Sequence, residues 1–75
     1  MQIDITYNVG KSMKRGKEGY SPIVRGHKHD ALFYRSFRNA EASALRLAEA
    51  QAKTLRGNGH AVIVRLDETA GLVRI

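Results

Sequence analysis

The side chains best suited to chemistry in this sequence are cations that cluster ahead of residue 39, with aromatic residues among them. The aromatic residues are Tyr20, Phe33, Tyr34 and Phe37, and the cations are Lys11, Lys14, Arg15, Lys17, Arg25, Lys28, Arg35 and Arg38. Only Glu18 and Asp30 oppose these cations between residues 10 and 38, so this segment accounts for the whole net charge of +6. Basic side chains neutralise phosphates and aromatic faces stack on bases. The pattern supports a nucleic-acid hypothesis, and the alternative is a solvated basic surface above an aromatic core.

Gly10, Lys11 and Ser12 follow an expected strand and have the order that ends a phosphate-binding P-loop. That motif requires another glycine five residues earlier, where this chain has Ile5, and a helix after the serine. We therefore expect no nucleotide site of that kind.

His27, His29 and Asp30 are neighbours in the sequence and could be metal ligands together with His60. A single pair of histidines two residues apart is weak support for a zinc site, and the chain contains no cysteine. A polar turn is the favoured interpretation, so we expect neither a metal nor another cofactor.

Catalysis is not expected. No Ser/His/Asp or paired-carboxylate arrangement can be defended from the spacing of the residues. A chain of 75 residues also has little room for a closed pocket that excludes water. We expect this protein not to be an enzyme.

The composition indicates one small domain over residues 1–75. Its hydrophobic fraction of 43% is too high for a disordered chain, and the lack of cysteine favours a cytoplasmic setting. No apolar run approaches the length of a membrane span, so we expect no membrane association. A core this thin favours a homodimer that forms through sheet edges.

One long helix is expected over residues 39–57, where alanines and leucines recur at helical spacing. Asn39 is the expected N-cap, and Gly57 or Gly59 is the expected C-terminal glycine. Residues 40, 44, 47, 48 and 55 fall on one face of this helix, so we expect that face to be buried.

The rest of the chain has the alternation and turn residues of strands. We expect strands over residues 1–9, 20–25, 31–37 and 61–66, a short last strand over 72–75 as an open possibility, a turn over 26–30 and a mobile basic loop over 10–19. Phe33 and Phe37 are expected to face the helix. The expected fold is α+β, in the order β-β-β-α-β. It has an antiparallel sheet of three to five strands and the helix on one face.

Residues 20 to about 55 resemble the three-stranded-sheet-plus-helix DNA-binding domains of phage and transposon integrases, which plant AP2-type domains also resemble. The resemblance rests on residue types at Tyr20, Val24, Arg25, Arg35, Ser36, Phe37, Asn39, Glu41 and Ala42. It implies a small accessory or regulatory protein of mobile-element type, with Arg25 and Arg35 on a sheet face that meets DNA. RNA is the other nucleic acid considered.

Glu18, Gly19 and Tyr20 ahead of the same element order resemble antitoxin domains of the HicB type. That resemblance implies a second hypothesis, a protein–protein interaction module that binds an acidic protein partner or forms a dimeric adaptor without binding nucleic acid.

Overall fold

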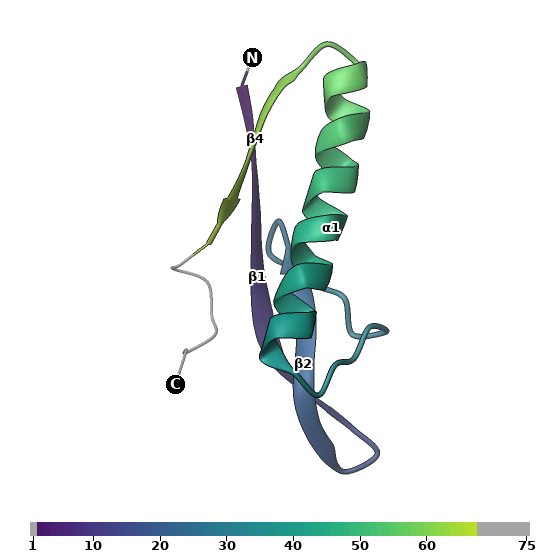
Figure 1. Cartoon of the computed structure of the whole chain (residues 1–75). Coiled ribbons are helices and arrows are strands. Elements are labelled where there is room, and N and C mark those ends of the chain that lie inside the picture. The colour runs from purple at the N-terminus through teal and green to yellow at the C-terminus, as the bar shows by residue number, and fades with distance from the viewer. Residues whose placement is uncertain (1, 68–75) are drawn as a thin grey trace.

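The computed structural model describes residues 2–67, in which one long helix lies against a four-stranded sheet (Figure 1). The elements in chain order are β1 (Gln2–Lys14), β2 (Lys17–Val24), β3 (His27–Lys28), α1 (Phe37–Gly57) and β4 (Ala61–Leu66). The strands lie in the order β3-β2-β1-β4. The α+β class and the order β-β-β-α-β expected from the sequence are therefore confirmed.

The sheet is mixed, so the prediction of a wholly antiparallel sheet is wrong for its last strand. β2 pairs antiparallel with both β1 and β3, whereas β4 pairs parallel with β1. The cause is α1, which carries the chain back along the sheet before β4 begins, as parallel strands require of their connection. The strand considered for residues 72–75 lies outside the described residues.

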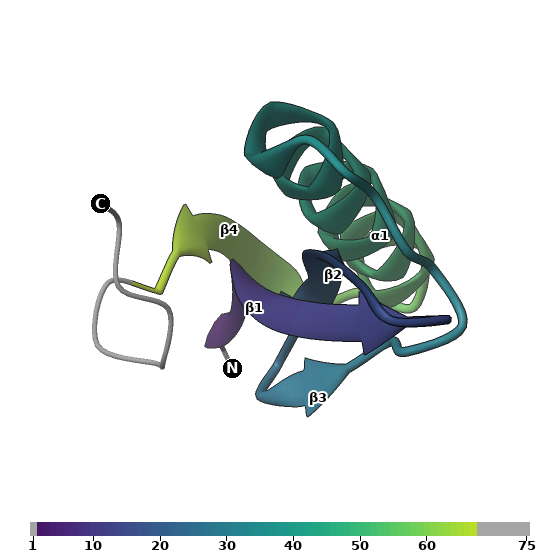
Figure 2. The same ribbon diagram turned by 90° about the horizontal axis from the view of Figure 1, so that it is seen from below.

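α1 covers one face of the sheet (Figure 2). Ile5, Val9 and Val24 project from that face and are fully buried. The helix meets them with small side chains one turn apart, which let the helix axis approach the sheet closely; these are Ala40, Ala44, Ala48 and Ala52. Larger residues, among them Leu47 and Leu55, are half-buried around this core. No helix within residues 2–67 is long and apolar enough to cross a membrane.

The ends of α1 differ from the prediction at the N-terminus and agree with it at the C-terminus. Ser36 is the N-cap, and its hydroxyl accepts a hydrogen bond from the Asn39 backbone N–H at 3.4 Å. The prediction of Asn39 as N-cap is therefore wrong, because Ser36 begins the helix one turn earlier. At the other end Gly59 adopts a φ of 91°, the left-handed conformation that glycine allows after a helix.

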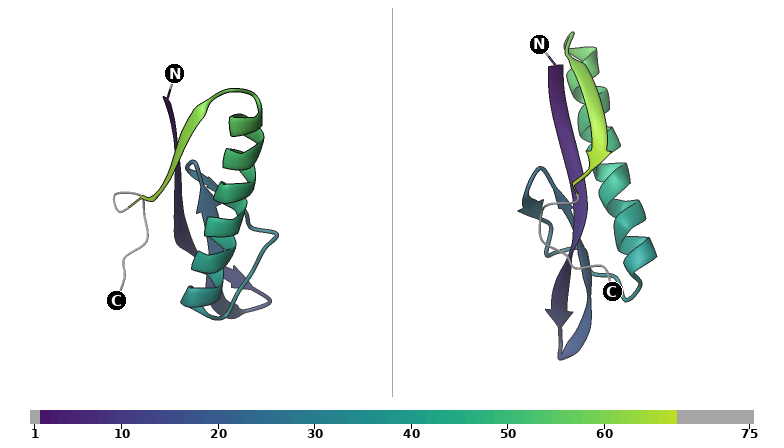
Figure 3. Two further views of the ribbon diagram at one scale, coloured as in Figure 1. Left: turned by 45° about the horizontal axis from the view of Figure 1, so that its top comes forward. Right: turned by 90° about the vertical axis from the view of Figure 1, so that its left-hand side faces the viewer.

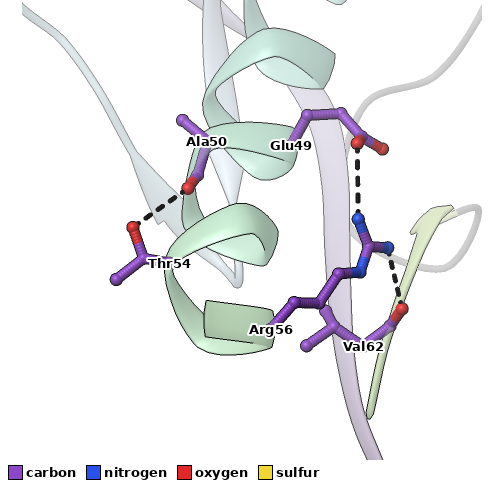
Figure 4. Close-up of polar contacts among 5 residues, drawn as sticks. All are labelled: Glu49, Ala50, Thr54, Arg56 and Val62. Carbon is purple, nitrogen blue, oxygen red and sulfur yellow. Dashed lines mark hydrogen bonds and ion pairs between the residues drawn. The ribbon is translucent and has the colours of Figure 1, made fainter. Parts of the chain in front are cut away.

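The C-terminal turns of α1 are also tied to β4 (Figure 4). The Arg56 guanidinium donates to the Val62 carbonyl at 2.9 Å and lies 3.9 Å from the Glu49 carboxylate. Alternate residues of a strand direct their backbone groups to opposite edges of that strand. The Asp67 backbone N–H donates to the Tyr7 carbonyl of β1, so odd-numbered residues of this segment direct their backbone groups toward β1. The Val62 carbonyl therefore points to the outer edge of β4, where Arg56 covers it.

Residues 10–19 do not form the loop that their glycines and charges predict. β1 continues to Lys14, and β2 begins at Lys17, directly opposite Lys14. The two-residue connection has positive φ at both positions, 53° at Arg15 and 76° at Gly16. Positive φ at both central residues is what a type I′ hairpin turn requires. We call residues 10–19 the basic ribbon.

The strand expected over residues 31–37 is also wrong. β3 forms instead within the predicted turn, after a second tight connection at Arg25 and Gly26, whose φ values are 54° and 79°. The only sheet contact from residues 31–37 is a bridge between Tyr34 and Tyr20. A turn at residues 30 and 31 redirects the chain before a longer strand can pair.

The segment between β3 and α1 wraps around the β2 side of the sheet. The Tyr34 hydroxyl lies 3.0 Å from the Ser43 hydroxyl of α1, and the Phe37 ring meets the Tyr20 ring edge-on. Phe33 lies instead against Gly19, on the face of the sheet away from α1, which we call the far face. The prediction that Phe37 faces inward is therefore right, and the prediction for Phe33 is wrong.

Gly19 allows a close contact that a side chain would prevent. A Cβ at Gly19 would lie 2.4 Å from the Phe33 ring and 2.5 Å from the Tyr34 carbonyl oxygen, which is backbone and cannot rotate away. We expect Gly19→Ala to lower the free energy of unfolding by about 1–3 kcal/mol, as overpacked sites do. Urea unfolding measures this change.

Gly57→Ala is the matched control, because a Cβ at Gly57 would meet no atom within 4 Å. Alanine favours the helix over glycine, so this variant is expected to be as stable as the natural chain or up to about 1 kcal/mol more stable. Equal stability of the Gly19→Ala and Gly57→Ala variants would contradict the packing described above.

Candidate nucleic-acid interface

The strongest concentration of charge lies at the end of the basic ribbon, which projects past the first turn of α1 (Figures 1 and 3). Lys14, Arg15 and Lys17 occupy three of the four positions at this end, with Gly16 between them. All three cations are exposed. We call these four residues the ribbon tip.

The ribbon tip is electrostatically unfavourable for the isolated protein. Lys14 and Lys17 are direct cross-strand partners, and like charges in that position destabilise a hairpin. None of the ion pairs in the described part of the chain involves a ribbon-tip cation. The tip is therefore a site where a polyanion would relieve repulsion that the protein itself leaves uncompensated.

Arginine at the hairpin turn adds a backbone cost. Arg15 and Arg25 each precede a glycine in a two-residue turn and adopt positive φ, 53° and 54° respectively. Asparagine and aspartate are the usual residues at that turn position, because they tolerate the left-handed conformation better than a longer side chain does. Each turn thus presents a guanidinium where an asparagine would favour folding.

A second group of cations surrounds an open hollow of about 510 Å³ at the base of the ribbon. The residues that line it are Lys11, Ser12, Met13, Glu18, Gly19, Tyr20, Lys28 and Arg35. Lys28 crosses the far face over Gly10, and its ammonium donates to the Lys11 carbonyl at 2.6 Å and lies 3.6 Å from the Asp30 carboxylate. The fold thus brings Lys11, Lys28 and Arg35 together from three separate segments.

The remaining two residues predicted to contact nucleic acid, Arg25 and Arg38, lie outside both the ribbon tip and the hollow. Arg38 is exposed in the first turn of α1. Arg25 lies in the turn at the opposite end of β2 from Lys17, about 26 Å away at roughly 3.3 Å per residue. Neither Arg25 nor Arg35 lies on a strand, so the expectation that both would sit on the sheet is wrong.

The histidines do not assemble a metal site in the described structure. The rings of His27 and His29 meet edge-on with centroids 5.0 Å apart, at and after the short strand β3. Among residues 2–67, no group of three or more histidine, cysteine, aspartate or glutamate side chains could hold a metal ion.

Ser12 and Gly19 are among the lining residues of the hollow that were not predicted as site residues. They are direct cross-strand partners, and both project to the far face. The sequence offers no clear signal for them, because Lys11 breaks the alternation of residues 1–9 and the density of glycine and lysine predicts a loop.

The strain at the two turns can be measured. We expect Arg15→Asn and Arg25→Asn each to raise the free energy of unfolding by about 0.5–1 kcal/mol, because asparagine tolerates positive φ. Urea unfolding of the two single variants tests this expectation. A loss of stability in either variant would show that the arginine side chain holds its turn by a contact that the structure does not show.

Comparison with known proteins adds no family to this description. No protein-family model matches the chain, and no curated protein or solved structure matches it. The resemblances to integrase-type and HicB-type domains stay predictions.

Proposed function

We propose that this protein binds nucleic acid through the ribbon tip, with duplex DNA as the preferred form. The observation that carries the proposal is the placement of Lys14, Arg15 and Lys17, three exposed cations without an acidic partner in the described structure, on a projecting two-stranded ribbon. Neutralising phosphates with such cations releases counterions and supplies most of the affinity of non-specific binding.

The shape of the ribbon favours duplex DNA over duplex RNA. A two-stranded β-ribbon can enter the major groove of B-form DNA, which is about 12 Å wide. The major groove of A-form RNA is too deep and narrow for side chains to read. The ribbon projects past α1, so the helix does not block its approach to a groove (Figure 3).

The cost of the tip to folding also supports the proposal. Two lysines face each other across the strands, and an arginine occupies a left-handed position that suits asparagine. Local unfavourable choices of this kind are expected where a sequence serves a function in addition to folding.

Salt dependence tests the proposal directly. We expect the affinity for a random duplex to fall with salt and the slope to flatten when Lys14, Arg15 and Lys17 are replaced with glutamine. The slope should decrease by about 0.9 for each phosphate that the variant no longer neutralises. Fluorescence anisotropy with labelled duplex DNA, single-stranded DNA and RNA at several salt concentrations provides the measurement.

A triple variant with the same change in net charge is the control. Arg25, Arg46 and Lys53 are exposed and lie away from the ribbon, so their replacement with glutamine should leave most of the slope unchanged. In addition, Arg15→Asn should weaken binding and Arg25→Asn should not, although both remove one charge from the same turn position. Equal effects of the two triple variants, or no binding at low salt, would refute the ribbon tip as the interface.

The outer edge of β4 supports a second candidate, the association of two copies. No strand within residues 2–67 pairs with that edge, and Ile63 on the adjoining far face is 46% exposed. An unpaired edge is a template for another strand. Sedimentation at high micromolar concentration should then show a dimer that Ile63→Lys weakens, and a monomer throughout would exclude this candidate.

A further inference from the structure

We propose that the hollow at the base of the basic ribbon is a phosphate-binding site whose donors are Ser12, Lys28 and Arg35. This inference deepens the proposed function, on which it rests for the source of the phosphate, a nucleic-acid strand held by the ribbon tip. A small phosphorylated molecule has the same chemistry and is the other source that the experiment distinguishes.

The three donors come from three different segments and line one hollow. Ser12 belongs to β1, Lys28 to β3, and Arg35 to the segment that leads into α1. A phosphate group presents oxygens in several directions, so it can accept from donors that approach from different sides. Arginine binds phosphate through two parallel N–H groups, lysine through a point charge and serine through its hydroxyl.

The charges at the hollow favour an anion. Its lining includes the cations Lys28 and Arg35. Lys11 and Glu18 also line it, but strand alternation directs their side chains to the face opposite that of Ser12, so their opposite charges lie to one side of the donors. Among the described ion pairs, none involves Lys11 or Arg35. A partly enclosed group of cations attracts a phosphate more strongly than the same charges spread over the surface would.

Lys28 is held in place before any ligand arrives. Its side chain passes over Gly10, with Cδ 3.6 Å from the position that a Cβ at residue 10 would occupy. Its ammonium group donates to the Lys11 carbonyl at 2.6 Å, and Asp30, which is 3.6 Å away, is largely exposed. An ammonium has three donors, so donors remain for a phosphate oxygen. A cation that is already ordered loses less side-chain entropy when it binds.

The size of the hollow suits a phosphate ester. Its volume of about 510 Å³ exceeds the space that a phosphate group alone needs, so an attached sugar can enter beside the phosphate. The hollow also adjoins the ribbon tip, since Met13 and Glu18 line it and precede and follow the tip in the chain. A strand held at the tip therefore lies close enough to place a neighbouring phosphate in the hollow.

Titration of the full chain with inorganic phosphate, followed by amide and arginine side-chain NMR signals, tests the site. We expect saturable shifts at Ser12, Gly19 and the Arg35 guanidinium that sodium chloride at matched ionic strength does not produce. Arg35→Gln should raise the apparent Kd for phosphate by about tenfold, and Ser12→Ala should raise it by a smaller factor. Arg35 is exposed and forms none of the described ion pairs, so its replacement should leave the fold intact.

Arg38→Gln is the matched control, because Arg38 is an exposed arginine three residues away that does not line the hollow. This variant should bind phosphate as the natural chain does. Shifts that spread evenly over all the cations, or equal effects of Arg35→Gln and Arg38→Gln, would overturn the proposed site.

Further titrations separate this site from the proposed function and identify the source of the phosphate. With Lys14, Arg15 and Lys17 replaced by glutamine, phosphate should still saturate the hollow while duplex affinity falls. If phosphate or a 5′-mononucleotide saturates the hollow but no duplex binds at low salt, the phosphate site stands, its ligand is a small molecule, and the nucleic-acid function fails. If duplex binds but phosphate produces no localised shift, the ribbon tip stands and the phosphate site fails.

Discussion

The division of one long strand between two partners determines the layout of this protein. β1 has 13 residues, of which Gln2 to Tyr7 pair with β4 and Tyr7 to Lys14 pair with β2. The two neighbours therefore overlap at a single residue, and the sheet is staggered rather than rectangular. The first half of β1 lies beside β4 in the helix-covered core, and the second half continues into the basic ribbon. The ribbon depends on this stagger, because a β4 that paired along the whole of β1 would leave no projecting two-stranded segment.

Folding and charge make opposing demands along the ribbon. Near its base, Gly10 and Gly19 admit Lys28 and Phe33 against the far face, which gives this narrow segment tertiary contacts. At its tip, repulsion between lysines and an arginine with positive φ oppose the hairpin. A two-stranded hairpin alone is only marginally stable in water, so the contacts at the base keep the tip in strand form despite its charge. Gly10 and Gly19 therefore act here by allowing close packing.

The sequence predicts those elements whose periodicity is uninterrupted. The alanine repeat of α1, the alternation of residues 1–9 and the β-branched run of β4 each follow the spacing of one regular structure. The prediction failed where one residue type is compatible with two different local structures. Glycine and lysine at residues 10–19 indicate a loop by composition, yet Gly10 and Gly19 are packing positions within strands. Phe33 and Phe37 share an alternation, but the chain turns around the sheet between them, so they lie on opposite faces. The cationic site residues could be predicted from their charge. Which of them lie at the ribbon tip and which line the hollow could not, because that division depends on the register in which β1 pairs with β2.

Two carbonyl groups covered by cations hinder growth of this sheet on its β4 side. Lys28 bonds the Lys11 carbonyl, which alternation directs to the side of β1 away from β2, and Arg56 bonds the Val62 carbonyl at the outer edge of β4. A foreign strand that adds at either place, including a second copy at the outer edge of β4, must first displace a cation from its acceptor and bring its own backbone beside a positive charge. Addition of successive copies into an extended fibril therefore meets a barrier at both places. A phosphate that accepts from the remaining donors of Lys28 leaves this bond in place, so occupancy of the hollow preserves the barrier at β1.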